Sequence, residues 1–229
     1  MGNLSVFGSS IDLTQSVLVS RTGSIFASAS GDFNAVGLGA SAPQFVAPEG
    51  ISLFAGNNID ISRSVFSSLS VNLTAQNNLT LDTVAFLTAG GPAENTRLSA
   101  GGNMSLSTVA FRSANVSLDA QNMRLTQVGF FPGATNSGNA SLTAPGAMFL
   151  GGVNFQSQNV ALESRTIALT NVAFAAQSNV TLRSQTGLLA LRPNTGRPVE
   201  LGKVNFIQSV TYGGKPAQNF INRGITLTK

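Results

Sequence analysis

The chain contains no His, no Cys and no Trp among its 229 residues, and it has a single Tyr. Without His there is no imidazole for general-base catalysis or metal binding, and without Cys there is no thiolate nucleophile, zinc–thiolate site or disulfide. Charge is also scarce, because Asp, Glu, Lys and Arg make up 10% of the residues, against about 25% in typical soluble domains. These absences exclude most enzyme chemistry and favour a structural or binding protein.

No run of about 18 apolar residues occurs, so the sequence predicts no helical membrane span. The formal net charge is +4, but the basic residues are spread along the chain and we expect no nucleic-acid partner. The polar side chains are mainly Ser, Thr, Asn and Gln, while 42% of the residues are hydrophobic. This balance suits close-packed strands around a continuous apolar core.

The main signal is a repeated phrase, apolar-x-Leu-x-x-Val-x-Phe, which recurs about every twenty residues. A second phrase, apolar-x-Leu-x-Ala, precedes nearly every copy. Short stretches of alternating apolar and polar residues, divided by turn residues, are typical of strands that bury one face. The good copies of the first phrase begin at Leu79, Met104, Met123, Met148, Ile167 and Val199, looser copies begin at Ile11 and Ile59, and a degraded copy runs through Phe33 and Ala35.

A unit of about twenty residues cannot bury its own apolar side, so successive units must stack. The sequence therefore predicts an all-β fold, a parallel β-helix (three-sided β-solenoid) of about nine rungs with a period of about 19–25 residues. We expect repeats over residues 1–206 and a non-repeat segment over residues 207–229 that ends in a strand. One inward column of aromatic rings is predicted from Phe66, Phe86, Phe111, Phe130, Phe155 and Phe174.

The residue inside each Val-x-Phe faces outward and is small in most repeats. It either forms a flat lateral wall against which another rod packs, or it marks a corner too tight for larger side chains. The sequence favours neither interpretation. The column consists of Ala85, Ala110, Gly129 and Ala173, with Asn154 and Asn205 at the same position of two further repeats.

Both ends of the chain carry the strand pattern, and neither shows a capping helix. Uncovered strand edges present unpaired N–H and C=O groups, which soluble solenoids normally cover. Either the ends join copies head to tail into a filament, or the chain is a fragment whose caps lie in sequence outside it. The residues predicted to form the joint are Leu4, Val6, Ile225 and Leu227 in the end strands and Tyr212, Phe220 and Ile221 in the C-terminal segment, which either caps the last rung or reaches the next subunit.

β-Solenoids also include polysaccharide lyases and hydrolases, whose sites need clustered carboxylates and basic side chains on one wall. Here the nine acidic residues fall one per rung or fewer, and no two share a register on adjacent rungs. Glu163 and Arg183 would be rung neighbours, which predicts an exposed ion pair. We therefore predict no enzyme activity and no catalytic, cofactor or metal site.

Repeats such as Asn115-Val-Ser-Leu-Asp-Ala and Asn159-Val-Ala-Leu-Glu-Ser resemble the filamentous-haemagglutinin-type β-helical repeats of large bacterial surface and secreted proteins. The resemblance covers most of the chain from Leu4 to Phe206. It implies a cell-surface or secreted location and an adhesive or scaffolding role.

The sequence thus predicts a non-catalytic structural subunit that stacks end to end into an extracellular filament or surface fibre. The alternative is a monomeric adhesin or carbohydrate-binding stalk, a fragment of a larger bacterial surface protein. Sugar platforms need exposed Tyr or Trp, so the absence of Trp and the single Tyr212 favour the filament. The expected partners are other copies of the chain, with a cell-surface polysaccharide as the further candidate.

Overall fold

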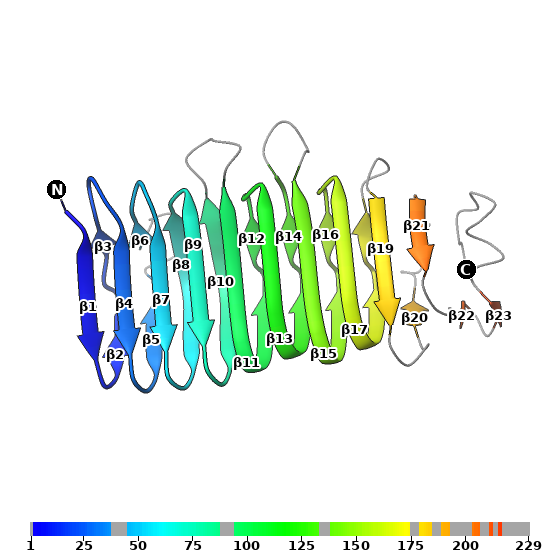
Figure 1. Cartoon of the computed structure of the whole chain (residues 1–229), viewed down its shortest axis with the longest axis horizontal. Helices are drawn as coiled ribbons and strands as arrows, with labels where there is room; N and C mark the ends of the chain where they lie inside the picture. Colours follow the sequence, from blue (N-terminus) through cyan, green and yellow to red (C-terminus); the bar gives the residue numbers. More distant parts are fainter. Residues whose placement is uncertain are drawn as a thin grey trace.

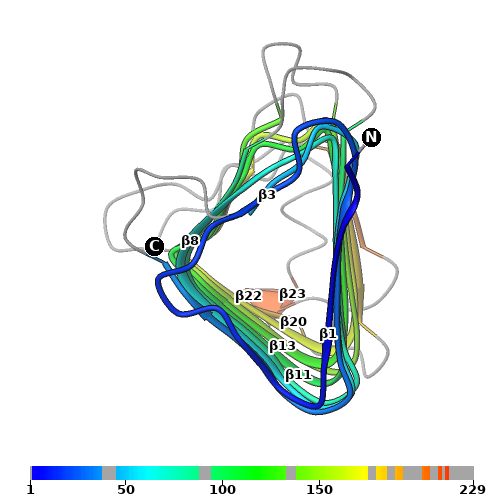
Figure 2. The same ribbon diagram turned by 90° about the vertical axis from the view of Figure 1, so that its left-hand side faces the viewer.

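The computed structural model describes residues 2–37, 45–87, 94–132, 138–174, 179–184, 189–192, 203–206, 211–212 and 215–216. Over these residues the chain forms 23 strands and no helix. The strands follow one another in parallel coils that stack along one axis, with the N-terminal coil at one end of the rod (Figure 1). Viewed along this axis the coils form a triangle (Figure 2), which confirms the predicted all-β solenoid with three walls.

Wall A contains the first strand of each coil. Its members are β1 (Leu4–Gly8), β4 (Ile25–Ala29), β7 (Ile51–Ala55), β9 (Ser70–Ala75), the first halves of β11 (Asn95–Ser107), β13 (Asn115–Thr126), β15 (Asn139–Gly151) and β17 (Asn159–Thr170), and then β19 (Asn179–Ser184) and β21 (Lys203–Phe206).

Wall B follows it in each coil. It contains β2 (Ile11–Asp12), β5 (Phe33–Val36), the first halves of β8 (Ile59–Ser67) and β10 (Leu79–Leu87), the second halves of β11, β13, β15 and β17, and then β20 (Leu189–Arg192) and β22 (Thr211–Tyr212), with β23 (Lys215–Pro216) antiparallel to β22.

Wall C closes the triangle with short strands. It contains β3 (Leu18–Val19), β6 (Phe45–Val46), the second halves of β8 and β10, and then β12 (Ala110–Phe111), β14 (Gly129–Phe130), β16 (Asn154–Phe155) and β18 (Ala173–Phe174).

Pairing between coils sets equivalent residues of the repeat next to one another. On wall A, for example, Leu98 pairs with Leu73 on one side and with Leu118 on the other. Since alternate residues of a strand point to the same face, the apolar positions of every coil meet inside the triangle. They form one buried core that runs from Ile11 to Leu182.

The predicted column of Phe rings forms inside wall C. Neighbouring ring centroids from Phe45 to Phe174 lie 4.6 to 5.2 Å apart, with interplanar angles between 5° and 19°. This spacing matches the distance of about 4.8 Å between hydrogen-bonded strands, so each coil places its ring on the ring of the preceding coil. The column begins one coil earlier than predicted, at Phe45, which pairs with Phe66.

The corner between walls B and C requires a left-handed backbone. One residue of positive φ occupies this corner in most described coils, and only Gly152 among them is a glycine. Left-handed conformation costs a residue with a Cβ roughly 1–2 kcal/mol. The stacking of each coil on its neighbours therefore imposes the turn on Gln15, Arg63, Thr83, Thr108, Gln127 and Asn171.

The last predicted copy of the repeat lies in a different place from the one expected. Val204 pairs with Val180, and Phe206 pairs with Leu182, so both lie on wall A. Phe206 therefore does not extend the Phe column, and Asn205 does not belong to the small-residue column of wall C. The reason is that apolar-x-apolar fits the first strand of a coil as well as the Val-x-Phe position, and flanking turns decide between them.

Truncating a ring in the middle of the column is expected to open a cavity between two stacked neighbours. Phe111→Ala should lower the unfolding free energy by about 3–5 kcal/mol, which is typical for a buried Phe. Urea unfolding followed by far-ultraviolet circular dichroism measures the change. The control is Phe7→Ala, because Phe7 is 70% exposed and its loss should cost about 1 kcal/mol or less. Equal losses for the two variants would contradict the stacked core.

Candidate functional site

The first coil at the N-terminal end of the rod has hydrogen-bonded strands on one side only among the described strands. Among the described strands, β1, β2 and β3 pair only with β4, β5 and β6 of the second coil. Leu4 and Val6 point inward but are only partly buried, and they pack against the core together with Leu13 and Leu18. The predicted end strand thus exists, with the apolar side chains of its first coil incompletely covered.

The backbone of β1 shows which of its groups face outward from this end. In a parallel pair, the N–H and C=O groups of one residue point to the same neighbour, and they alternate along the strand. The N–H of Leu4 donates to the carbonyl of Ser24 at 2.9 Å, and the carbonyl of Gly8 accepts from the N–H of Ser30 at 3.0 Å. The backbone groups of Ser5 and Phe7 therefore point away from β4, toward the position of a preceding strand.

The other predicted end residues are only partly placed. Tyr212 lies in β22, next to the short antiparallel strand β23. Thr211 in the same strand pairs in parallel with Ala190 on wall B, so the stacking continues beyond residue 206 there. The remaining predicted joint residues, Phe220, Ile221, Ile225 and Leu227, lie outside the described residues.

The small-residue column exists on the outside of wall C. Ala85, Ala110, Gly129 and Ala173 lie in register, with Asn154 between the last two. Ala173 is exposed, and Ala85 and Ala110 are half-buried. Gly129 is buried, because a Cβ at this position would lie 2.0 Å from Cε2 of Phe131. A ring thus covers the column at Gly129, and a small residue is required there for packing and not for an open face.

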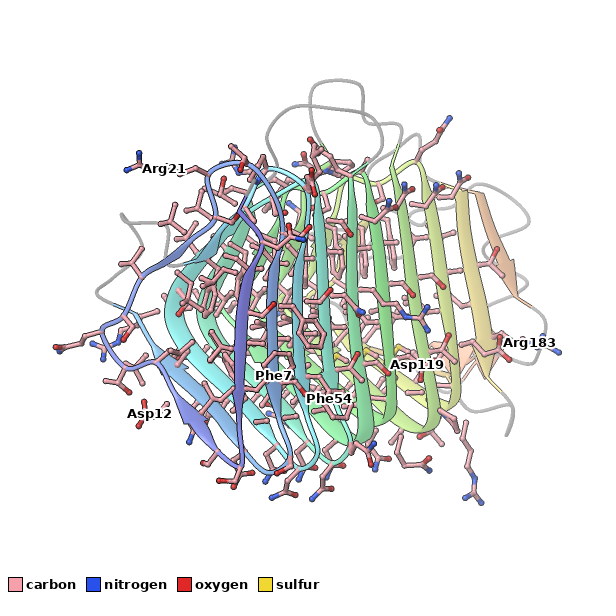
Figure 3. All side chains as sticks on the ribbon, turned by 60° about the vertical axis from the view of Figure 1, so that its left-hand side comes forward. Phe7, Asp12, Arg21, Phe54, Asp119 and Arg183 are labelled. Atoms are coloured by element: carbon pink, nitrogen blue, oxygen red, sulfur yellow. The ribbon has the colours of Figure 1, made fainter. Side chains whose placement is uncertain are left out.

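Outward aromatic side chains on wall A were not anticipated from the sequence. Phe7 is 70% exposed and Phe26 is 41% exposed, and their ring centroids lie 5.6 Å apart. Phe54, which is half-buried, lies on the same face two coils from Phe7 (Figure 3). The alternating pattern of the sequence could have revealed them, because each of these Phe residues is the second or fourth residue of its strand, where the side chain points outward.

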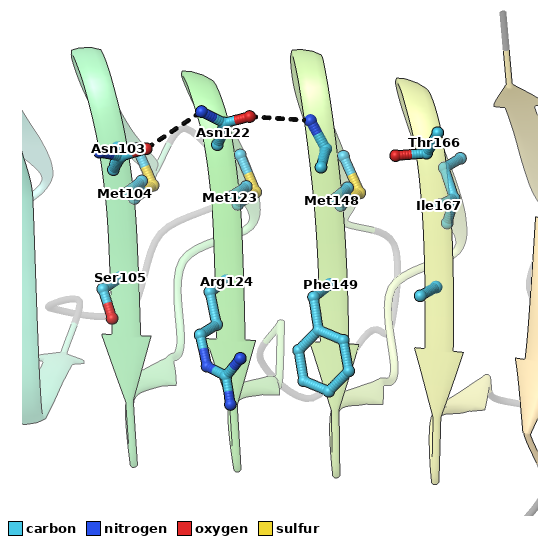
Figure 4. A pocket seen from close by; sticks show the side chains of 12 residues that line it. Asn103, Met104, Ser105, Asn122, Met123, Arg124, Met148, Phe149, Thr166 and Ile167 are labelled. Carbon is cyan, nitrogen blue, oxygen red and sulfur yellow. Dashed lines mark hydrogen bonds between the residues drawn. The ribbon is translucent and has the colours of Figure 1, made fainter. Parts of the chain in front are cut away.

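Wall B carries a shallow hollow of about 490 Å³ over β11, β13, β15 and β17 (Figure 4). Its lining includes Phe149, and the guanidinium carbon of Arg124 lies 4.7 Å from the centre of that ring. Gly151 makes room for the ring, because a Cβ there would lie 3.1 Å from Cε1 of Phe149. Ser105, which pairs with Arg124, and Thr166, which pairs with Ala147, also line the hollow and add hydroxyl groups to it.

Rows of Asn side chains reinforce two corners of the coil. At the corner between walls A and B, Asn122 donates to Asn103 at 3.1 Å and accepts from the N–H of Ala147 at 3.0 Å. At the start of wall A, Asn115 donates to Asn95 at 3.1 Å, and the row continues through Asn139 and Asn159. These amides bond to the next coil, so we assign them a structural role.

The carboxylates of the described strands are dispersed. Asp12 and Asp60 share a register, but Asn34 lies between them. The hydroxyl and N–H of Thr14 bond to Asp12 and hold the pKa of its carboxyl below the usual value. Over the described residues, no group of three acidic side chains is close enough to bind a metal ion.

The predicted ion pair forms between wall A coils. Arg183 Nη1 lies 3.7 Å from Glu163 Oε1, and the two side chains are 55% and 42% exposed. Exposed pairs of this kind contribute about 0–1 kcal/mol, so we assign this pair no functional role.

Comparison with family models, with curated proteins and with solved structures finds no match. The resemblance to filamentous-haemagglutinin-type repeats therefore stays a prediction. In the described part of the chain there is also no helix of the length and apolarity needed to cross a membrane.

Placing a long cation on wall C tests whether the small-residue column packs against another rod. Ala110→Arg should prevent side-by-side association of rods while leaving the strand content unchanged, because the outward side chain can extend into solvent. Light scattering and negative-stain electron microscopy measure the association. Ser141→Arg, an exposed substitution on wall A, is the matched control. Lateral association that survives in Ala110→Arg would remove this column as an interface.

Proposed function

We propose that this chain is a non-catalytic structural protein whose rods stack end to end into an extracellular fibre. The observation that supports the proposal is the open edge of the first coil, where β1, β2 and β3 have a paired strand on one side only among the described strands. An exposed edge of this kind is a template for adding a strand from another chain.

The first coil also fits a preceding coil by its side chains. Leu4 pairs with Ile25 and Val6 pairs with Ala27, so the inward positions of β1 continue the inward positions of β4. A strand with apolar residues at alternate positions would therefore extend the core in register. Its addition would bury Leu4 and Val6, which are now only partly covered, and apolar burial is the main favourable contribution to association.

The C-terminal sequence supplies candidate strands of the same pattern. Ile225 and Leu227 are spaced for one wall A strand, and this spacing supports their assignment to the opposite side of the joint. The secreted or cell-surface location in a bacterium belongs to the same proposal, and the resemblance of the repeats supports it.

The direction of the Ser5 backbone provides a selective test of end-to-end stacking. Ser5→Pro removes an N–H that points away from β4, so the coil itself should remain folded, since Pro is tolerated where a strand edge faces solvent. Stacking should be lost, because the added ring blocks hydrogen bonding to a preceding strand. Electron microscopy of the purified chain, with image analysis of any fibres, measures the outcome.

Ser5→Ala keeps the N–H and should form fibres like the unchanged chain. Circular dichroism must show equal strand content in both variants. Fibres formed equally by Ser5→Pro and Ser5→Ala would show that β1 is not the joint. Short separate rods from the unchanged chain would contradict the end-to-end proposal itself.

A second candidate function is carbohydrate binding at the hollow on wall B. It is favoured by the partly exposed Phe149 ring beside Arg124, since aromatic faces pack on sugar rings and guanidinium groups bind carboxylate and hydroxyl oxygens. Phe149 supplies an aromatic surface like that of Tyr or Trp, without their polar group.

Removing this ring distinguishes the second candidate from the first. Phe149→Ala should lower binding to a panel of immobilised acidic polysaccharides by about tenfold, which corresponds to about 1.4 kcal/mol of binding free energy. Fibre formation should be unaffected. Phe54→Ala on wall A is the matched control. Equal binding by the two variants, or no binding by the unchanged chain, would exclude the hollow as a sugar site.

A further inference from the structure

The two halves of the chain carry opposite net charge. Residues 1–94 contain six of the nine acidic residues and two of the thirteen basic residues, which gives a formal charge of −4. Residues 95–229 contain the other three acidic and eleven basic residues, which gives +8. Over the described residues the coils follow one another along the axis, so for these residues the division of the sequence becomes a division of the rod (Figure 1).

The acidic half presents its charge at the surface of the first coils. Asp12, Asp60 and Asp82 point outward from wall B, and Glu49 is exposed just before β7. Only Arg21 and Arg63 oppose them in this half of the sequence. Asp12 forms its bonds with Thr14 within its own turn, and the pKa of its carboxyl is lowered, so it stays ionised near neutral pH.

The basic half presents exposed arginines over the later coils. In the described part of this half, the acidic side chains are Asp119 and Glu163, and Arg183 pairs with the second of them. Arg183 lies at the opposite end of the rod from Asp12 (Figure 3). The exposed basic residues here are Arg97, Arg112, Arg124, Arg165 and Arg183. By sequence, residues 185–229 add six basic residues and one acidic residue.

A rod with this charge distribution has a preferred partner at each end. Two acidic ends repel one another, and so do two basic ends, whereas an acidic end attracts a basic end. Fields of this kind raise the rate of productive encounters and suppress the wrong pairings. We propose that the acidic N-terminal coils of one rod dock on the basic C-terminal coils of a second copy, so that charge sets the polarity of the fibre.

This inference rests on the proposed end-to-end stacking and adds what selects the partner and its orientation. Two rods lying side by side in opposite directions would also bring the halves of unlike charge together. The open edges of β1, β2 and β3 favour the end-on arrangement, because they lie at the acidic end and a lateral pair would leave them uncovered. The charge attracts the second rod, and the strand edges then hold it.

The first experiment follows fibre growth by light scattering and electron microscopy as the salt concentration is raised. Going from about 10 mM to about 1 M NaCl shortens the Debye length from about 30 Å to about 3 Å. We expect the growth rate to fall by about tenfold or more over this range, since electrostatic steering is worth one to three orders of magnitude in association rate.

A matched pair of variants tests the position of the charges at constant net charge. Asp60→Asn with Asp82→Asn halves the negative charge of the acidic end, and we expect growth at low salt to slow by several-fold. Gln121→Lys with Ser141→Lys makes the same change in net charge but places it in the basic half, on exposed side chains. This second variant should grow at least as fast as the unchanged chain.

The possible outcomes separate this inference from the proposal on which it rests. Fibres that grow at the same rate in all salt concentrations and in both variants would overturn the charge-directed polarity and leave end-to-end stacking intact. Discrete pairs of rods at low salt, without fibres, would overturn the end-on polarity in favour of lateral pairing. Rods that do not associate at any salt concentration would overturn both.

Discussion

Parallel pairing between equivalent residues of successive coils is the constraint on which the rest of this structure depends. Once the coils are held in one register, each apolar position of the repeat packs against the equivalent position of the preceding coil and of the following coil. The Phe column, the continuous core and the Asn rows at two corners all follow from this translation. The same translation sets equivalent outward positions side by side along the walls, so the surface is also a set of columns, although the residue type changes from coil to coil, as from Glu163 to Arg183.

The ends of such a structure differ in kind from its walls. A wall presents side chains only, because its backbone groups are paired with the neighbouring coils, whereas an end presents backbone groups and core side chains together. In the proposed fibre, the first coil would combine directional hydrogen bonding with the apolar surface of Leu4 and Val6, and the acidic residues of the first coils would add a longer-range attraction. Attraction at a distance and attachment on contact would then come from different groups of the same end.

The period of the repeat was sufficient to predict the fold, since alternation within strands and recurrence between them both appear directly in the sequence. The register of Phe66 with Phe86, and the pairing of Glu163 with Arg183, followed from counting residues between equivalent positions. The position of Phe206 was wrong because one short apolar-x-apolar stretch fits two walls.

The parts of the candidate sites that the sequence did not reveal depend on side-chain contacts that the repeat pattern does not describe. The ring of Phe131 covers Gly129, but Phe131 follows the end of β14, and the repeat pattern does not extend to that position. The contact of Arg124 with Phe149 joins two neighbouring coils, and predicting it would require the conformations of both side chains. The opposite charge of the two halves can be counted in the sequence. It becomes a difference between the two ends of the molecule only because the coils follow one another along the axis of a rod.

The left-handed corner between walls B and C has a consequence for how the protein folds. A single coil isolated from its neighbours would have to adopt an unfavourable backbone at a residue such as Thr83 or Thr108 without the stacking that compensates it. Each coil is therefore stabilised by stacking on a coil that already exists. We expect folding to start from a nucleus of several stacked coils and to proceed by adding further coils to it.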